Sequence, residues 1–124
     1  MDFYFDNERP IYLQLLEQLK TAIIAGTFAP GEKLPSVREL ALSAKVNPNT
    51  VQKALGELER QGLIFTERTN GKFVSEETAI LERSKAALAA AKTAKFLEEM
   101  QSIGISPSAA LDFVKKTAEG LSED

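Results

Sequence analysis

Residues 36–58 read SVRELALSAKVNPNTVQKALGEL and contain two helix starts. Ser36 lies three residues before Glu39, the spacing of a capping box, in which each side chain accepts a hydrogen bond from the other residue's backbone N–H. Asn47 precedes Pro48, and these residue types are favoured at the N-cap and at the first position of a helix. The stretch therefore predicts a short helix over SVRELALSA, a tight turn, and a second helix from Asn47.

The second of these helices is amphipathic. One buried stripe is predicted from apolar residues at the i, i+3, i+4 and i+7 positions, which are Val51, Ala54, Leu55 and Leu58. The opposite face carries Asn49, Gln52, Lys53, Gly56 and Arg60, with Thr50 at its edge. Asparagine and glutamine can pair with adenine and lysine with guanine, so this face is suited to reading base edges, although a polar helix face is more often only solvated.

The chain before residue 36 predicts one more helix. Apolar residues recur at helical spacing from Pro10, which is expected at the first helical position, and Gly26 is expected as a left-handed cap. The following stretch, GTFAPGEKLP, is rich in glycine and proline and reads as a loop, with a short extended piece at Lys33–Leu34.

A β-hairpin is predicted in residues 63–75, LIFTERTNGKFVS. Asn70-Gly71 is a strong signal for a two-residue turn in which both residues have positive φ. Phe65, Phe73 and Val74 are expected to close the core. Helix, short helix, turn, helix and hairpin is the order of a winged helix-turn-helix, which we expect in residues 1–75.

Residues 76–124 have a different character. A long alanine-rich helix is expected over residues 78–102, ended by Gly104, and a last helix is expected from Ser106 as cap and Pro107 as first residue. One side of the last helix carries Leu111, Val114, Ala118 and Leu121. The long helix is apolar on more than one side, so we expect a two-helix dimerisation arm; packing back onto residues 1–75 is the alternative. The predicted fold is mostly α with a small hairpin wing.

Charge is distributed unevenly. The 124 residues carry a net charge of −3, but residues 1–75 contain nine basic and nine acidic side chains. Between residues 33 and 53 there are four basic side chains, Lys33, Arg38, Lys45 and Lys53, against one acid. Local charge determines the potential that a phosphate meets, so this window is compatible with nucleic acid, although a solvated basic face is the simpler interpretation of charge alone.

The composition argues against several classes of function. There is no Cys and no His, which removes thiolate or imidazole metal ligands and the usual general base. The acidic N-terminus lacks the layout of a signal peptide, and no apolar run approaches the ~20 residues that span a bilayer. We therefore expect a cytoplasmic protein that is not an enzyme, with no cofactor, no metal and no membrane partner. An unknown small-molecule effector is left open.

Two long stretches carry a resemblance to a known family. GTFAPGEKLPSVREL and VNPNTVQKALGELERQGLI resemble the DNA-binding domain of GntR-family bacterial transcription regulators, over roughly residues 9–75. VNPNTV and the short C-terminal part are similar to the YtrA subfamily. The chain departs from the family in the wing, where TNGKFV stands in place of G-x-G-T-F-V; Thr69 replaces a glycine and Lys72 a threonine.

The resemblance implies which residues bind DNA. In the family the arginine of the PSxREL motif contacts DNA, the opening of the third helix reads bases or phosphates, and the wing tip enters the minor groove. Together with the capped helix starts and the polar face, this gives the candidate set Ser36, Arg38, Asn47, Asn49, Thr50, Gln52, Lys53, Asn70, Gly71 and Lys72.

The expected function is therefore sequence-specific binding of double-stranded DNA by a homodimeric repressor, at an inverted-repeat operator. The alternative is a winged helix that binds only proteins. We further expect Lys33 and Lys45 to bind phosphates, which affects affinity for any duplex, whereas Asn49 and Thr50 affect which sequence is bound.

Overall fold

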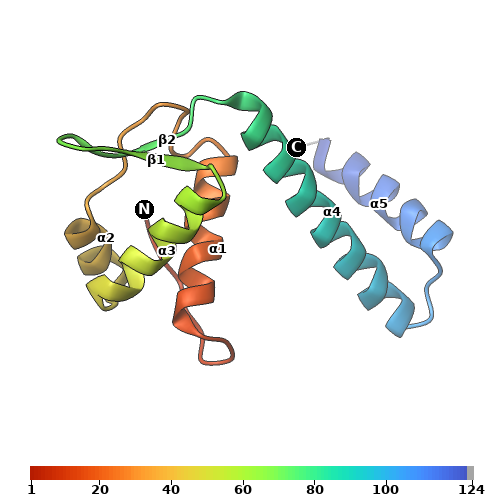
Figure 1. Ribbon diagram of the computed structural model, residues 1–124. Helices are drawn as coiled ribbons and strands as arrows, with labels where there is room; N and C mark the ends of the chain where they lie inside the picture. Colours follow the sequence, from red (N-terminus) through yellow and green to blue (C-terminus); the bar gives the residue numbers. More distant parts are fainter. Residues whose placement is uncertain (123–124) are drawn as a thin grey trace. The chain divides into compact units, whose positions relative to one another are not determined.

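The computed structural model describes residues 1–122, which form five helices and one antiparallel hairpin (Figure 1). The elements are α1 (Ile11–Ile24), α2 (Val37–Ala44), α3 (Pro48–Arg60), β1 (Ile64–Glu67), β2 (Gly71–Val74), α4 (Thr78–Ser102) and α5 (Pro107–Ser122). Their order confirms the predicted winged helix-turn-helix followed by two helices.

The chain divides into two compact units, residues 1–84 and the residues from Lys85 onward. The boundary expected after Ser75 follows β2 directly. The first unit extends further, to Ser84, because Leu81 at the start of α4 is buried in the same core as α1 and α3.

The caps of α2 and α3 are those that the sequence predicts. The Ser36 hydroxyl accepts a hydrogen bond from the Glu39 backbone N–H at 3.1 Å, and the Glu39 carboxylate accepts one from the Ser36 N–H at 3.3 Å. The Asn47 side chain accepts from the Asn49 N–H at 2.8 Å. Lys45, in the turn between the two helices, has φ of 57° and is the only non-glycine with positive φ in residues 1–122.

The start of α1 differs from the prediction by one residue. Pro10 is the N-cap, with ψ of 137°, and the helix begins at Ile11. An extended ψ places the proline outside the helix, although its fixed φ still leads the chain into it. At the other end, Gly26 has φ of 82°, which confirms the expected left-handed residue after the helix.

The hairpin has a longer loop than predicted. Glu67 pairs with Gly71, so three residues connect the strands, and the Asn70 N–H donates to the Glu67 carbonyl at 3.2 Å. Gly71 has φ of 103°, but Asn70 does not have positive φ, so the two-residue turn was wrong. A turn over residues 67–70 therefore precedes Gly71, whose positive φ is easily adopted by glycine. Lys33 forms the expected extended contact, a bridge to Phe73.

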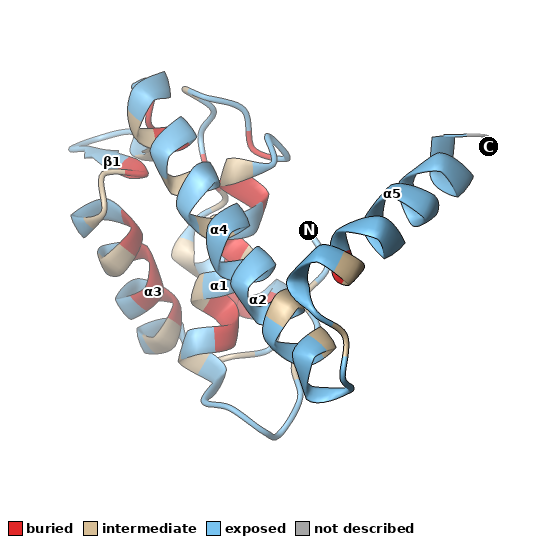
Figure 2. Ribbon diagram, turned by 90° about the vertical axis from the view of Figure 1, so that its right-hand side faces the viewer, coloured by how far each residue is buried: buried red, intermediate tan, exposed pale blue. Residues whose placement is uncertain are grey.

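The core of the first unit is formed by the predicted helix faces and the base of the hairpin, and Figure 2 shows the buried faces of α1 and α3 in red. Its fully buried large side chains are Leu15, Leu19, Leu40, Val51, Leu55, Leu58, Leu63 and Val74. Phe65 and Phe73, expected in the core, instead stack on each other, with their ring centroids 5.6 Å apart and Phe65 37% exposed. Strand side chains alternate between faces, and the Ile64–Val74 pair takes the core side.

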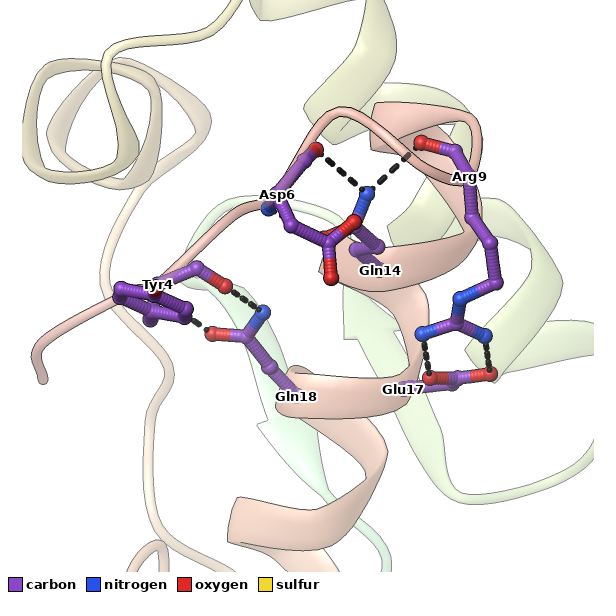
Figure 3. Close-up of polar contacts among 6 residues, drawn as sticks. All are labelled: Tyr4, Asp6, Arg9, Gln14, Glu17 and Gln18. Atoms are coloured by element: carbon purple, nitrogen blue, oxygen red, sulfur yellow. Dashed lines mark hydrogen bonds and ion pairs between the residues drawn. The ribbon is translucent and has the colours of Figure 1, made fainter.

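The segment before α1 is held by two glutamine side chains that the sequence did not single out (Figure 3). Gln14 is 3% exposed; its carbonyl oxygen accepts from the Asp6 N–H, and its amide donates to the carbonyls of Asp6 and Arg9. Gln18 binds both the N–H and the carbonyl of Tyr4. These bonds fix the segment with Phe3 and Phe5 packed against the core.

The second unit confirms the predicted helices but has little core of its own. The hydroxyl of Ser106 caps α5 by accepting from the Ala109 N–H at 3.2 Å, and Gly104 has φ of 84° after α4. Between Lys85 and Ser122, Ala110 alone is buried. The exposed large apolar residues there are Phe96, Ile103, Leu111, Phe113, Val114 and Leu121. No helix in residues 1–122 is long and apolar enough to cross a membrane.

Candidate nucleic-acid interface

The basic side chains of residues 1–75 fall into two groups. Five of the nine have partners there: Arg9 with Glu17, Lys20 with Gln61, Lys53 with the Tyr12 ring, Arg60 with Glu57, and Lys72 with Thr66 and Glu59. Within residues 1–122 the other four have neither a hydrogen bond nor an ion pair: Lys33, Arg38, Lys45 and Arg68. Lys33 lies in the segment before α2, Arg38 at the start of α2 and Lys45 just after its end. Arg68 lies in the hairpin loop.

A groove of about 410 Å³ lies between the hairpin loop and the segment that leads into α2. Its polar side chains come from both sides: Lys33 and Ser36 from the segment, and Thr66, Glu67, Arg68, Thr69, Asn70 and Lys72 from the hairpin, where Gly71 also lines the groove. The structure thus brings together four of the predicted residues, Ser36 from the start of α2 and Asn70, Gly71 and Lys72 from the hairpin. It also adds Arg68, which the sequence analysis missed; a charged residue inside the hairpin loop was the available signal.

The start of α2 adds to the positive character of this surface. The first N–H groups of a helix and the positive end of its dipole attract an anion. Arg38 is exposed in the first turn, so its planar guanidinium can reach a phosphate or a guanine. Ser36 and Asn47 already use a side-chain oxygen as a cap, so both have a structural role irrespective of any ligand.

The outer face of α3 presents polar side chains. Asn49, Gln52 and Lys53 are exposed, and Thr50 is half-buried at the edge, as predicted. Within residues 1–122 the side-chain amides of Asn49 and Gln52 make no hydrogen bond, so they are available to base edges. The Lys53 ammonium lies 4.3 Å from the centroid of the Tyr12 ring, a cation–π contact between α3 and α1.

The Lys72 side chain does not extend freely into solvent but contacts Thr66 and Glu59. It is paired with Thr66 across the strands, and its ammonium donates to the Thr66 hydroxyl at 2.8 Å and lies 3.9 Å from a Glu59 carboxylate oxygen on α3. The Thr66 hydroxyl in turn donates to Glu59. The wing is therefore attached to α3 by the hydrogen bond from Thr66 to Glu59, and Lys72 adds a longer ion pair to the same carboxylate.

The C-terminal end of α3 is electrostatically balanced. Hydrogen bonds from Arg60, and secondarily from Gln61, lower the pKa of Glu57 to about 2, so the carboxylate stays charged and compensates Arg60. The uncompensated positive charge of residues 1–75 is consequently found at the start of α2, the α2–α3 turn and the hairpin loop.

The sequence profile of the family described as "Bacterial regulatory proteins, gntR family" matches residues 11–74, more than half of the chain. The chain belongs to the gntR family. This GntR-family chain is 49% identical over 78 residues to the HTH-type transcriptional repressor YtrA of Bacillus subtilis, a match that covers 61% of this chain and 60% of that protein. The expected family and the similarity to YtrA are confirmed.

Solved structures show the same fold. A GntR family transcriptional regulator from Listeria monocytogenes superposes with a TM-score of 0.83 and 40% identity, over 90% of this chain and 98% of that chain. AraR(DBD) in complex with operator ORX1 superposes with a TM-score of 0.56 and 30% identity, over 60% of this chain and 96% of that chain. This GntR-family chain is a transcription regulator with a winged helix-turn-helix, and the relatives named here are regulators, not enzymes.

Proposed function

We propose that this chain represses transcription in the cytoplasm by binding an inverted-repeat operator in double-stranded DNA as a homodimer. The observation that carries the proposal is the location of the four unpaired cations, Lys33, Arg38, Lys45 and Arg68, around the helix-turn-helix and the hairpin loop. Half or more of the hydrogen bonds that proteins make to DNA go to phosphate and sugar, and basic side chains placed around a recognition helix are suited to that task.

In this proposal α3 lies in the major groove with its N-terminal half toward the bases, as in other helix-turn-helix proteins. Asn49, Thr50 and Gln52 read base edges, and Lys33, Arg38 and Lys45 bind phosphates on either side. Lys53 joins the base contacts only by leaving the Tyr12 ring. Asn70 and Gly71 take the loop of the wing to the minor groove next to it, with Arg68 beside them. AraR(DBD), whose structure is in complex with an operator, supports this mode of binding.

The homodimer is supported by the second unit. Its large apolar side chains stay exposed in the single chain, with Leu121 at 72% and Leu111 at 53%. Large apolar side chains that stay exposed together on one helix are typical of protein–protein contacts. A two-fold dimer places two identical heads on DNA, which requires two half-sites in inverted orientation. Repression is supported by YtrA, which is named a repressor; a dimer on its operator would exclude polymerase from an overlapping promoter.

Selection of bound duplexes from a random pool tests the proposal. We expect enrichment of an inverted repeat, together with a dimer in analytical ultracentrifugation. Asn49→Ala should change the selected sequence, whereas Lys33→Ala should weaken binding to every duplex and reduce the salt dependence by ~0.9 in slope. Failure of the wild type to bind any duplex at low salt would contradict DNA binding and favour a winged helix that binds only proteins.

A further inference from the structure

Lys72 is the residue at which this wing departs most from the pattern G-x-G-T-F-V, because a charged side chain stands in place of threonine. In the strand register it lies opposite Thr66, on the same face of the hairpin as the buried pair Ile64 and Val74. That face is turned toward the core and α3, not away from them. The backbone position therefore directs the ammonium toward α3, where Glu59 stands in the last turn.

Three side chains form a chain of contacts between the wing and α3. Lys72 donates to the Thr66 hydroxyl at 2.8 Å and lies 3.9 Å from one Glu59 carboxylate oxygen, while Thr66 donates to the other oxygen of the same carboxylate. We call Glu59, Thr66 and Lys72 the wing clamp. The Lys72 and Glu59 side chains are 28% and 40% exposed, so this ion pair adds little to the stability of the fold. Its main effects are to orient the Lys72 side chain and to compensate the charge of its ammonium.

Thr66 and Lys72 of the wing clamp line the groove, whereas Glu59 does not. Lys72 lines it together with Lys33 and Arg68, and of these three cations Lys72 alone has a carboxylate partner within residues 1–122. Lys33 and Arg68 are thus available to a phosphate, whereas Lys72 is compensated by Glu59. The groove is also lined by one carboxylate, that of Glu67, which accepts a hydrogen bond from the Asn70 side-chain amide at 3.1 Å. A phosphate in the groove would have to compete with the Glu59 carboxylate for the Lys72 ammonium.

We propose that Glu59 is a positioning residue of the DNA interface, which holds Lys72 on α3 through the wing clamp and thereby limits sequence-independent attraction of DNA to the groove. The inference rests on the proposed function, because it concerns binding of the phosphate backbone. Without the negative charge of Glu59, Lys72 becomes a further phosphate contact and the wing is held less firmly on α3. Affinity for any duplex then rises while discrimination between operator and other sequences falls.

The test uses full-length protein with Glu59→Gln, which keeps the size of the side chain and an oxygen that can accept from Thr66 but removes the charge. Glu98→Gln is the matched control, since it changes net charge equally on an exposed residue of the second unit. Fluorescence anisotropy with a random-sequence duplex is recorded from 50 to 300 mM salt. We expect the salt slope of Glu59→Gln to steepen by ~0.9 and its affinity to rise about five-fold near 0.15 M salt, with Glu98→Gln unchanged.

The double variant Glu59→Gln with Lys72→Met identifies the cation responsible. It should return to the wild-type slope or below it; a double variant that retains the increase would overturn the proposal, as would Glu59→Gln with wild-type slope and affinity. In the free protein, backbone amides of the hairpin should exchange with deuterium faster in Glu59→Gln, independently of DNA. A wild type that binds no duplex refutes both the proposed function and this inference, whereas a binding wild type with an unaffected Glu59→Gln refutes only the latter.

Discussion

The two units of the chain leave different kinds of groups unsatisfied. In the first unit most large apolar side chains belong to an enclosed core, with Leu15 and Leu58 at 0% exposure, although Leu42 remains exposed. What distinguishes this unit is a set of four cations around the helix-turn-helix and the hairpin loop that have no partner within residues 1–122. In the second unit Ala110 alone is buried between Lys85 and Ser122, and large apolar side chains of α5 and the end of α4 stay exposed. Unpaired cations are complementary to phosphates and exposed apolar side chains to another protein surface, so each unit indicates the chemistry of its own partner.

Removal of residues 85–124 should have the largest effect on binding. The fragment 1–84 retains the whole core and should fold and bind a single half-site like the full-length chain. On a complete operator its affinity should fall by roughly 10²–10⁴-fold, because two tethered heads bind with an effective concentration that separate heads lack. Anisotropy titrations with half-site and full-site duplexes measure the affinity for a single half-site and for the complete operator. Equal affinity of the fragment and the full-length chain on the full site would show that the second unit does not link two heads.

A matched pair of leucine truncations tests where the apolar side chains act. Leu58→Ala removes a fully enclosed side chain of α3 and should lower the free energy of unfolding by about 2–5 kcal/mol. Leu111→Ala, on exposed α5, should change the unfolding of the monomer by less than about 0.5 kcal/mol. Urea unfolding at low protein concentration measures the stability of the monomer, and sedimentation at high concentration measures its association. Leu111→Ala should shift the association equilibrium toward monomer; if it does not, Leu111 lies outside the interface.

Arg38→Ala should weaken operator binding while leaving the fold intact. Arg38 is exposed and has no partner within residues 1–122, so its loss removes little packing. A bidentate contact to a base contributes ~1–3 kcal/mol of discrimination, which corresponds to roughly 5- to 150-fold in affinity. Arg83→Ala is the control, an exposed arginine outside the helix-turn-helix. Circular dichroism verifies folding, and unchanged operator affinity in a folded Arg38→Ala chain would remove Arg38 from the interface.

Lys45→Gly should have opposite effects on stability and on binding. The left-handed conformation at this residue is unfavourable for lysine and accessible to glycine, so the substitution should stabilise the fold by about 0.5–1 kcal/mol. It also removes an unpaired charge, so the affinity for every duplex should decrease and the salt slope should flatten by ~0.9. Thermal unfolding measures the gain in stability, and fluorescence anisotropy measures the loss of DNA affinity. A variant that is more stable and binds DNA equally well would show that Lys45 does not contact phosphate.

The smallest effect is expected at a cation that already has its partner. Arg60 holds the pKa of Glu57 at about 2, below its usual 4.5, so the charged carboxylate favours the folded state. This contribution is complete above pH 4.5 and is lost as the pH falls toward 2. In Arg60→Met the pKa of Glu57, followed by NMR titration, should rise toward its usual value, and it should rise less in Gln61→Leu. DNA binding should not change, since this pair lies away from the groove; a loss of binding would contradict that separation.

The parts of the fold that were predictable are those specified by neighbouring residues. The capping box of Ser36 and the Asn47-Pro48 start each require only a few consecutive positions, and the buried stripe of α3 follows from helical periodicity. The hairpin loop and the outward orientation of Phe65 depend on strand register, which the turn residues alone did not determine. The same holds for the partner of Lys72 and the role of Gln14, because both depend on segments that meet only in the folded chain.

Of the candidate interface, the structure locates each predicted side chain but leaves the contacts with DNA as predictions. Sequence reasoning treated Lys53 and Lys72 as free to reach DNA. The structure holds both, on Tyr12 and on the wing clamp. Ion pairs and cation–π contacts between elements cannot be read from residue types, because they require knowledge of which faces oppose one another. Arg68 was overlooked for the same reason, since its position beside the groove follows from the loop geometry.

The way in which Gln18 holds the N-terminal segment has a practical consequence. Its amide binds the backbone N–H and carbonyl of Tyr4, and the Tyr4 side chain itself is 82% exposed. The attachment therefore depends on the main chain at this position, and any residue except proline can satisfy it. With no cysteine elsewhere in the sequence, Tyr4→Cys would supply a unique thiol for a fluorescent dye or a spin label. Such a reporter would sit on an anchored segment, so that distances measured from it describe the first unit and not a mobile tether.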